Sequence, residues 1–366
     1  MISTSIFPGR YVQGDQALNI LADEVKRQGN SALVIADKFV FEQSKSTIEQ
    51  ALGQEIEFTL EPFAGECCDD EIDRLVELFE NHSANVIIGI GGGKTLDTAK
   101  AVSNKQNCPI IIVPTIASTD APCSALAVIY NNDGSFKRYE VLPHNPNVVL
   151  VDTNIITHAP VRFLVAGMGD AFATWFEAED CRLKQGANMT GRVGCMSAYA
   201  LARLCHETLL EYGLLARQAC ENNIVTPALE HIVEANTLLS GLGFESGGLA
   251  AAHAIHNGLT AIPSTHSYYH GEKVAIGLQA MMFLTDRPSA TIDLVFDFCQ
   301  SIGLPICLAD IGMHEPTDEE LMQVATRACA TGETIHNEPY EITARRVMHC
   351  IKAADAEGRR RKSSLC

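Results

Sequence analysis

Hydrophobic and polar positions divide this chain into two parts with different periods. Up to about residue 160, short apolar runs rich in β-branched residues alternate with segments whose apolar residues recur at helical spacing. Helices are expected at residues 69–79 and from about Lys94 onward. Such alternation predicts βαβ units and a parallel, Rossmann-like sheet. The predicted strands are residues 31–36, 54–59, 86–90, 110–113, 125–130 and 148–151.

After Pro160 the strand signals nearly vanish. Residues 196–210, 228–239 and 321–331 carry apolar positions at helical spacing, and alanine and leucine recur through them. We therefore expect an α/β N-terminal domain over residues 1–160 and an all-α C-terminal domain over residues 161–366.

A glycine-rich junction follows the strand predicted at residues 86–90. Gly91, Gly92 and Gly93 precede Lys94, where a helical pattern begins. Glycine lets the backbone approach a ligand closely, and the first turn of a helix presents free N–H groups to an anion. The junction therefore predicts a phosphate cradle, although its spacing matches neither the Walker A loop nor the G-x-G-x-x-G fingerprint. A glycine-rich turn without a ligand is the alternative.

Other polar residues also follow predicted strands. Asp37 comes directly after residues 31–36, and residues 115–120 follow the strand at 110–113. Ligands of parallel sheets bind outside the carboxyl ends of the strands, so these segments are expected to converge with the glycine junction on one crevice. An acid at Asp37 can bond a ribose hydroxyl and reject a 2′-phosphate, which favours NAD over NADP. A plain turn aspartate is the alternative.

The net charge and the cysteine pattern limit the kinds of partner and the cellular compartment expected for this protein. The 366 residues carry a formal net charge of −18, which argues against nucleic acid or an anionic membrane as a partner. The thirteen cysteines are scattered without C-x-x-C spacing, and the first residues contain no long apolar stretch, so we expect reduced thiols in a cytoplasmic protein. Apolar runs are too short to span a bilayer. The basic segment 358–366 is expected to be a frayed, solvated end.

One acid and three histidines are candidate metal ligands: Asp170, His253, His256 and His270. Asp170 lies in a Gly-Met-Gly-Asp segment, which we interpret as a turn with room for a ligand. His253 and His256 are three residues apart on a helical pattern and share one face. A carboxylate with imidazoles suits a catalytic zinc. Packed or capping histidines are the alternative, because residues far apart in sequence cannot be shown to meet.

The segment G-G-G-K-T-x-D-x-x-K at residues 91–100 resembles that of the iron-containing and polyol dehydrogenase superfamily, which also holds dehydroquinate synthase. The resemblance implies a dehydroquinate synthase-like fold. Residues 113–130, 159–178, 243–259 and 269–277 resemble the glycerol-oxidising branch, in the same order along the chain.

By this resemblance, the metal ligands are Asp170, His253 and His270, and His256 lines the pocket. Iron-dependent relatives carry a further histidine four residues after the aspartate, where this chain has Thr174. Two histidines and one carboxylate form the ligand set of an open zinc site, so Zn²⁺ is expected, with iron or manganese as alternatives.

The activity implied by the resemblance is NAD-dependent oxidation of glycerol and related vicinal diols to dihydroxyacetone, by metal-assisted hydride transfer. Asp120 and His253 are the expected catalytic residues, with Asp120 holding a second substrate hydroxyl. A helix N-cap is the alternative for Asp120. Leu126 and Tyr130 would otherwise be interpreted as core. The positions that match the family's cofactor pocket, together with Asp37, are Gly93, Lys94, Thr115, Ser118, Ser124, Leu126 and Tyr130.

Two other functions remain open. The first is an enzyme of the same scaffold that acts on a phosphorylated substrate, glycerol-1-phosphate dehydrogenase or dehydroquinate synthase. The nearest cation in the sequence around the candidate ligands is Lys273, so a neutral polyol is favoured. The second is a nucleotide-binding protein without catalysis. The resemblance also implies a large homo-oligomer, an octamer.

Overall fold

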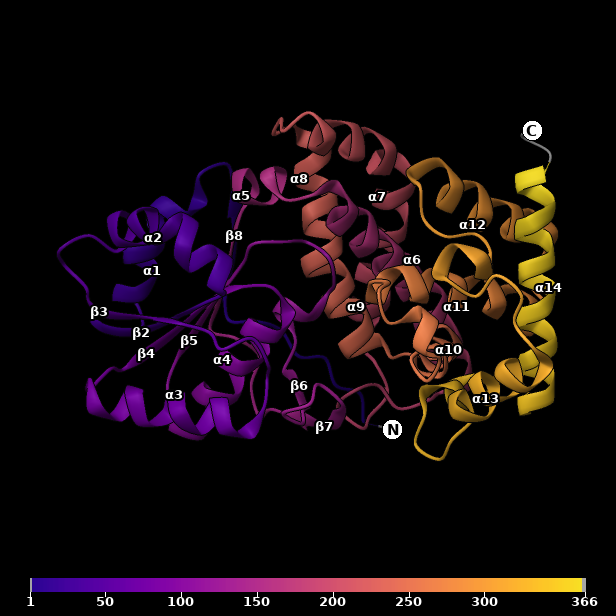
Figure 1. Ribbon diagram of the computed structural model, residues 1–366, viewed down its shortest axis with the longest axis horizontal. Coiled ribbons are helices and arrows are strands. Elements are labelled where there is room, and N and C mark those ends of the chain that lie inside the picture. The colour runs from indigo at the N-terminus through magenta and orange to yellow at the C-terminus, as the bar shows by residue number, and fades with distance from the viewer. Residues whose placement is uncertain (1, 364–366) are drawn as a thin grey trace.

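The computed structural model describes residues 2–363, in which a sheet-containing half lies beside a helical half (Figure 1). Among these residues, six parallel strands form one sheet in the order β1-β8-β5-β4-β2-β3. This arrangement confirms the predicted α/β and all-α combination. The strands are β1 (Tyr11–Gly14), β2 (Ser31–Ala36), β3 (Glu57–Pro62), β4 (Val86–Gly91), β5 (Ile110–Pro114) and β8 (Val148–Asp152).

The sheet has apolar side chains on both faces, as a parallel sheet covered on both sides requires. Leu33 and Ile87 pack into the core with α3 (Asp69–Asn81) and α4 (Gly93–Gln106). The intervening residues Val34 and Ile88 pack with α1 (Leu21–Lys26) and α2 (Lys38–Leu52) on the opposite face. Because alternate residues of a strand point to opposite faces, one β-branched run supplies both cores.

Two strand predictions need correction. The segment expected at 125–130 is β6 (Leu126–Tyr130), but it pairs antiparallel with β7 (Phe136–Val141) outside the parallel sheet. The strand expected at 54–59 begins three residues later, at Glu57. Neither β1 nor β7 was predicted, because their half-buried and exposed residues lack a continuous apolar run.

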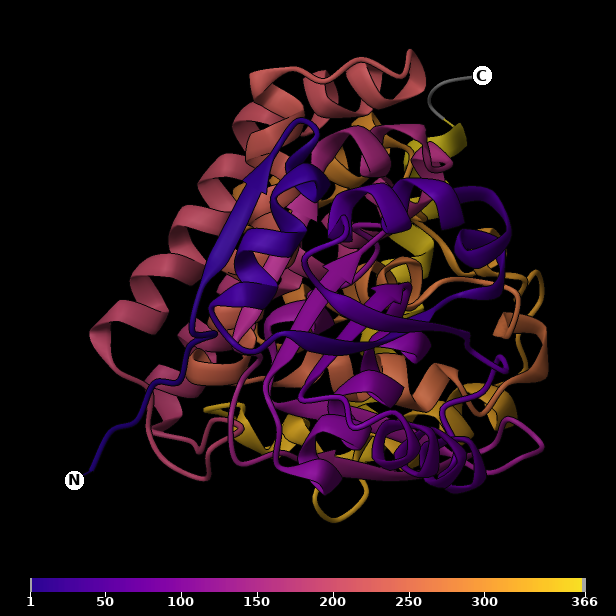
Figure 2. The same cartoon turned by 90° about the vertical axis from the view of Figure 1, so that its left-hand side faces the viewer.

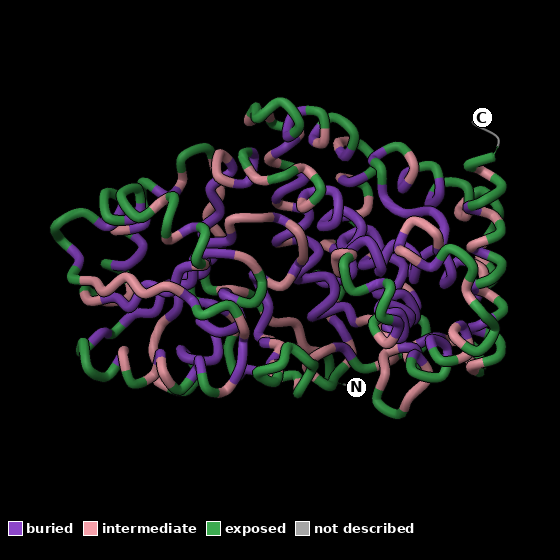
Figure 3. Tube along the Cα trace, in the orientation of Figure 1, coloured by how far each residue is buried: buried purple, intermediate pink, exposed green. Residues whose placement is uncertain are grey.

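Helices account for most of the second half of the chain, and the helical segments at its centre are mostly buried (Figure 3). The predicted helix at 196–210 continues to Glu221, and the one at 228–239 is α8 followed by the π-helical turn η3. No helix within residues 2–363 is long and apolar enough to cross a membrane. The main helices are α5 (Thr153–His158), α6 (Val161–Lys184), α7 (Met196–Glu221), α8 (Pro227–Glu234), α9 (Ser240–Gly247), α10 (Ala251–Leu259), α11 (His270–Leu284), α12 (Ser289–Ile302), α13 (Asp318–Ala328) and α14 (Ala344–Ser363).

The N-terminal segment lies on the helical half before the chain enters the sheet (Figure 2). The Thr4 amide donates to the carbonyl of Val193 at 2.9 Å, and the Ile6 amide donates to Ser246 Oγ at 2.9 Å. The chain then forms β1 at the sheet edge, beside β8. The first residues therefore join the two halves.

The basic C-terminal segment is not frayed up to Ser363, which corrects the expectation from sequence. It forms the last turns of α14, where the side chain of Arg361 is only 10% exposed and contacts Asp293, Asp297 and Glu357. The pairs with Asp293 and Asp297 fasten the helix end to α12, while Glu357 belongs to α14 itself. Residues 364–366 lie outside the described part of the chain.

Candidate metal and nucleotide site

Asp170 lies in the interior of α6 and not in a turn, which corrects the interpretation from sequence. The glycines around it serve close helix packing instead of a bend. A Cβ on Gly169 would lie 2.5 Å from the carbonyl oxygen of Gly271, and a Cβ on Gly271 would lie 1.8 Å from that of Ala166. These glycines therefore let α11 approach α6 closely enough for its first residue, His270, to reach Asp170.

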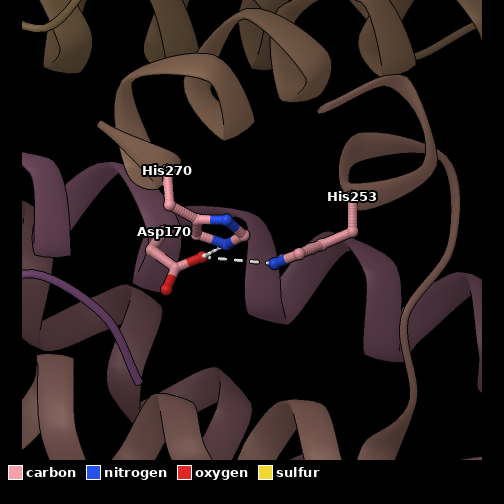
Figure 4. Close-up of side chains that lie close together, drawn as sticks. All are labelled: Asp170, His253 and His270. Atoms are coloured by element: carbon pink, nitrogen blue, oxygen red, sulfur yellow. Dashed lines mark hydrogen bonds and ion pairs between the residues drawn. The ribbon is translucent and has the colours of Figure 1, made fainter. Parts of the chain in front are cut away.

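In the described part of the chain, one carboxylate oxygen and two imidazole nitrogens from Asp170, His253 and His270 lie within 4.8 Å of one another (Figure 4). Asp170 Oδ1 is 3.2 Å from His253 Nε2 and 3.0 Å from His270 Nε2. Asp170 is fully buried and His253 nearly so, while His270 is about one-third exposed. The structure thus brings together three predicted ligands from three helices, and their donor set fits a divalent cation with an open position.

Glu177 contacts His253 on the ring nitrogen that faces away from Asp170, and it was not predicted from the sequence. It lies seven residues after Asp170 in α6 and therefore on the same helical face. Its Oε2 is 2.5 Å from His253 Nδ1, and its Oε1 accepts the backbone amides of Ala250 and His253 at 2.9 and 3.0 Å. A carboxylate in this place fixes the imidazole with Nδ1 protonated, which leaves Nε2 free to bind a metal.

The ionisation of these groups favours a cation. Burial alone would raise the pKa of Asp170, but the imidazoles of His270 and His253 hold it below its ordinary value. Burial works against a charged His253, yet Glu177 and Asp170 raise its pKa well above the ordinary value. Buried negative charge therefore accumulates around the point where the three ligand atoms meet.

His256 lies beside this group as expected, with its ring centroid 4.1 Å from that of His270. Its Nδ1 is 3.1 Å from Asn257 Oδ1. Burial, reinforced by His270 and Lys273, lowers the pKa of His256 well below its ordinary value. A neutral imidazole at this place can donate or accept a hydrogen bond.

Asp120 reaches the same place from the sheet half. Its backbone amide donates to Asp170 Oδ2 at 3.2 Å, and its carboxylate accepts from Ser240 Oγ at 2.7 Å. Asp120 occupies the N-cap position of the short 3-10 helix η2 (Ala121–Cys123), as the alternative expected, but its side chain accepts no amide of that helix. Burial and the charge of Asp170 raise the pKa of Asp120 well above its ordinary value. Thr174, one turn after Asp170, lies 2.8 Å from the same serine hydroxyl.

The glycine junction forms the turn from β4 into α4, which begins at Gly93. Gly91 has φ near +156°, and a Cβ there would lie 2.9 Å from Cβ of Asp37 and 3.0 Å from Thr95. Asp37 therefore adjoins the junction, as predicted. One of its oxygens accepts the amide of Phe39 at 2.9 Å, so it also begins α2.

Some of the other predicted cofactor positions lie at this junction or contact it. The Thr115 amide donates to the carbonyl of Gly91 at 3.0 Å, and Ser118 is half-buried in the loop between β5 and Asp120. Lys94 bonds Glu66 at 2.6 Å, with its Nζ 4.9 Å from the ring centre of Tyr130. A Cβ on Gly93 would meet no atom within 4 Å.

Leu126 and Tyr130 are half-buried on one face of β6, whereas Ala127 and Ile129 on the other face are fully buried. Tyr130 also packs against the main core, so the core interpretation holds for it in part, while each of the two side chains keeps an exposed portion.

Lys100, the last residue of the glycine-lysine motif, is buried and holds the loop after Asp120. Its Nζ donates to the carbonyls of Ala121 and Leu126 at 2.7 and 3.1 Å and to Ser124 Oγ at 3.3 Å. Asp97 lies 3.3 Å away and accepts the Val128 amide with its other oxygen. The motif therefore carries a buried ion pair that fixes Ser124 and the start of β6.

A parallel sheet with a glycine junction, joined to a helical half that carries one aspartate and two histidines, is the architecture of a two-part protein with a candidate metal site. Similarity to known proteins identifies the class as dehydrogenases. The model of the family described as "Iron-containing alcohol dehydrogenase" matches residues 8–153. The chain belongs to this family, as relatives over its whole length show.

Those relatives are glycerol dehydrogenases. One from Thermotoga maritima is 61% identical and covers 99% of this chain and 100% of the relative. One from Escherichia coli O6:H1 is 51% identical over 96% of both chains. The crystal structure of glycerol dehydrogenase from Schizosaccharomyces pombe superposes with a TM-score of 0.95 at 40% identity, covering 100% of this chain and 93% of the other.

Proposed function

We propose that this protein oxidises glycerol, and related vicinal diols, to dihydroxyacetone with NAD as the hydride acceptor. The observation that carries the proposal is the meeting of Asp170, His253 and His270 next to Asp120, which the loop after β5 brings from the sheet half. Whole-length similarity to glycerol dehydrogenases supports the substrate. In this proposal residues 1–160 bind the nucleotide, and residues 161–366 bind the metal.

The proposed metal is Zn²⁺, held by Asp170, His253 and His270. A divalent cation bound there would act as a Lewis acid that lowers the pKa of a substrate hydroxyl. The choice of zinc over the iron of the family's description rests on Thr174. Thr174 stands where iron-dependent relatives carry a further histidine, and its hydroxyl lies 2.8 Å from Ser240 Oγ.

The chain's own residues orient the substrate and the cofactor. Asp120, fixed by Ser240, is placed to accept a hydrogen bond from a second hydroxyl of a diol. Asp37 would bond a ribose hydroxyl, and the amides at the start of α4 would bind the pyrophosphate. NAD supplies the hydride chemistry. The other proposed cofactor contacts are Gly93, Lys94, Thr115, Ser118, Ser124, Leu126 and Tyr130.

A substrate panel read by NADH absorbance tests this function. Glycerol and 1,2-propanediol should be oxidised with NAD, chelator should abolish the rate, and Zn²⁺ should restore it. A strong preference for glycerol 1-phosphate over glycerol would contradict the proposal and favour the other enzymes of this scaffold. Metal analysis of protein purified without added metal decides the cation, and stoichiometric iron would overturn zinc.

A homo-oligomer in the cytoplasm is proposed on the same similarity. Light scattering of the purified protein measures its mass, and a monomer would contradict this part of the proposal.

A further inference from the structure

The start of α10, from which His253 projects, is held from two sides. Glu177 of α6 binds it on one side, as described above. On the other side, the segment around η6 (Thr334–Asn337) contacts the residues just before the helix. Thr334 Oγ1 donates to the carbonyl of Ala250 at 2.7 Å, and Asn337 Nδ2 donates to that of Leu249 at 2.8 Å. A third side chain, Glu338, accepts the amide of Ala251 at 3.0 Å.

Glu338 also meets a second buried carboxyl group. Asp180, in α6, is 1% exposed, as is Glu338. Asp180 Oδ1 accepts from Arg287 Nη2 at 2.6 Å, while Glu338 Oε1 is occupied by the Ala251 amide. The other two oxygens, Asp180 Oδ2 and Glu338 Oε2, are buried and receive no donor from the described residues.

The Asp180 and Glu338 carboxyl groups nevertheless act on each other closely enough to shift one another's pKa. Two ionised carboxylates contain no donor, so a hydrogen bond between these two orphaned oxygens requires a proton on one of them. The proton satisfies both buried oxygens at once. A buried polar atom without a partner keeps its full desolvation penalty, so sharing the proton is favoured.

The charges nearby assign the proton to Glu338. Burial raises the pKa of Asp180 as well, but Arg287, which pairs with Asp180 and with Glu179, both at 2.6 Å, opposes this rise and favours the ionised form of Asp180. Glu338 forms no ion pair within residues 2–363, while burial and the charge of Asp180 raise its pKa to about 9. Glu177 adds a further negative charge on the same side.

We propose that Glu338 is a positioning residue for His253. As a neutral acid it donates one hydrogen bond to Asp180 and accepts another from the Ala251 amide, and the two bonds fix the first turn of α10 relative to α6. Since Asp170 belongs to α6, this contact sets the distance between two of the three ligands. The inference rests on the metal-binding role proposed above for His253.

The test compares amide and alanine substitutions in the full-length protein, with Zn²⁺ retention measured by competition with a chelator. Glu338→Gln keeps both bonds, because its oxygen accepts from Ala251 and its NH₂ donates to Asp180. We expect its Zn²⁺ affinity within about twofold of the parent. Glu338→Ala removes both bonds, and a loss of about 10–100-fold is expected, as for other groups that orient a ligand.

The double variant Asp180→Asn, Glu338→Gln provides the decisive comparison. The Asn oxygen faces Arg287 and the Gln oxygen faces Ala251, so the two NH₂ groups point at each other and the shared bond is lost. We expect the double variant to lose Zn²⁺ affinity as Glu338→Ala does. Amide hydrogen exchange at residues 251–253 of the metal-free proteins should rise in the double and alanine variants but not in Glu338→Gln.

Glu338→Gln that binds Zn²⁺ as weakly as Glu338→Ala would overturn the neutral-acid assignment. A double variant that behaves like Glu338→Gln would overturn the shared bond, and this comparison holds even if Glu338→Ala fails to fold. Glu24→Ala is the matched control, because Glu24 is a buried carboxylate paired with Arg10 in the other half. His253→Ala separates the two proposals: unchanged Zn²⁺ retention there would refute the metal site itself.

Discussion

Replacing Glu177 with glutamine tests how the metal site is oriented, since this change alters one atom and almost no volume. Glu177 receives three hydrogen bonds, from two backbone amides and from His253 Nδ1. A glutamine has one acceptor oxygen and one donor NH₂, so it cannot receive all three.

Both orientations of the glutamine amide harm the site. If the NH₂ group faces His253 Nδ1, that nitrogen must accept, the proton moves to Nε2, and Nε2 no longer binds a metal. If the NH₂ group faces the amides of Ala250 and His253 instead, donors oppose donors in a fully buried place, at about 1–3 kcal/mol. Either outcome predicts a loss of Zn²⁺ affinity of about 10–100-fold, or roughly 1.4–2.8 kcal/mol.

Chelator competition measures this loss directly, and the thermal stabilisation gained on adding Zn²⁺ should shrink by a similar free energy. Glu179→Gln is the matched control, two residues along the same helix, where the carboxylate is 24% exposed and pairs with Arg287. We expect that control to bind Zn²⁺ like the parent. If Glu177→Gln also binds within twofold of the parent, the orienting role of Glu177 is wrong.

Three further predictions concern the packing and the buried charges. Gly271→Ala places a Cβ 1.8 Å from the carbonyl oxygen of Ala166, so α11 must move by about 1 Å. The free energy of unfolding should fall by about 1–3 kcal/mol, and Zn²⁺ affinity should fall with it. An unchanged melting temperature would contradict the close packing. Lys100→Met leaves Asp97 buried without its cation, and urea titration should show a destabilisation of about 3–5 kcal/mol, whereas a neutral result would refute the ion pair. Burial raises the pKa of Glu245 to about 7, so the folded protein keeps a proton that the unfolded chain releases at about pH 4.5. As the pH rises from 4.5 to 7, the free energy of unfolding contributed by this group should therefore fall by at most about 3 kcal/mol. Urea titrations at pH 5 and pH 8 should show this fall in the parent and not in Glu245→Gln.

The sheet half was predictable because its signals are local. A fully buried parallel strand reads as a continuous β-branched run, and β2 was predicted with its correct bounds. β7 lacks such a run, since its residues alternate between exposed and half-buried in an isolated hairpin. The pairing of β6 was wrong for a related reason, because the sequence of one strand does not name its partner.

The candidate site shows the same division. The identities of Asp170, His253 and His270 came from a resemblance, while their meeting could be seen only in the structure. Gly169 suggested a turn because glycine weakens helices, but its missing side chain is required by a neighbouring helix. Glu177 carries no local signal beyond its seven-residue spacing from Asp170, and such spacings are common on helices.

The N-terminal segment limits how this protein can be divided or recombined. Its first residues bond Val193 and Ser246 in the helical half, although the strand that follows completes the sheet. A fragment that ends near residue 160 would therefore contain the sheet half together with N-terminal residues that pack against the missing helical half. The two halves are therefore not consecutive in sequence. A chimera that exchanges the helical half has to exchange the N-terminal residues with it.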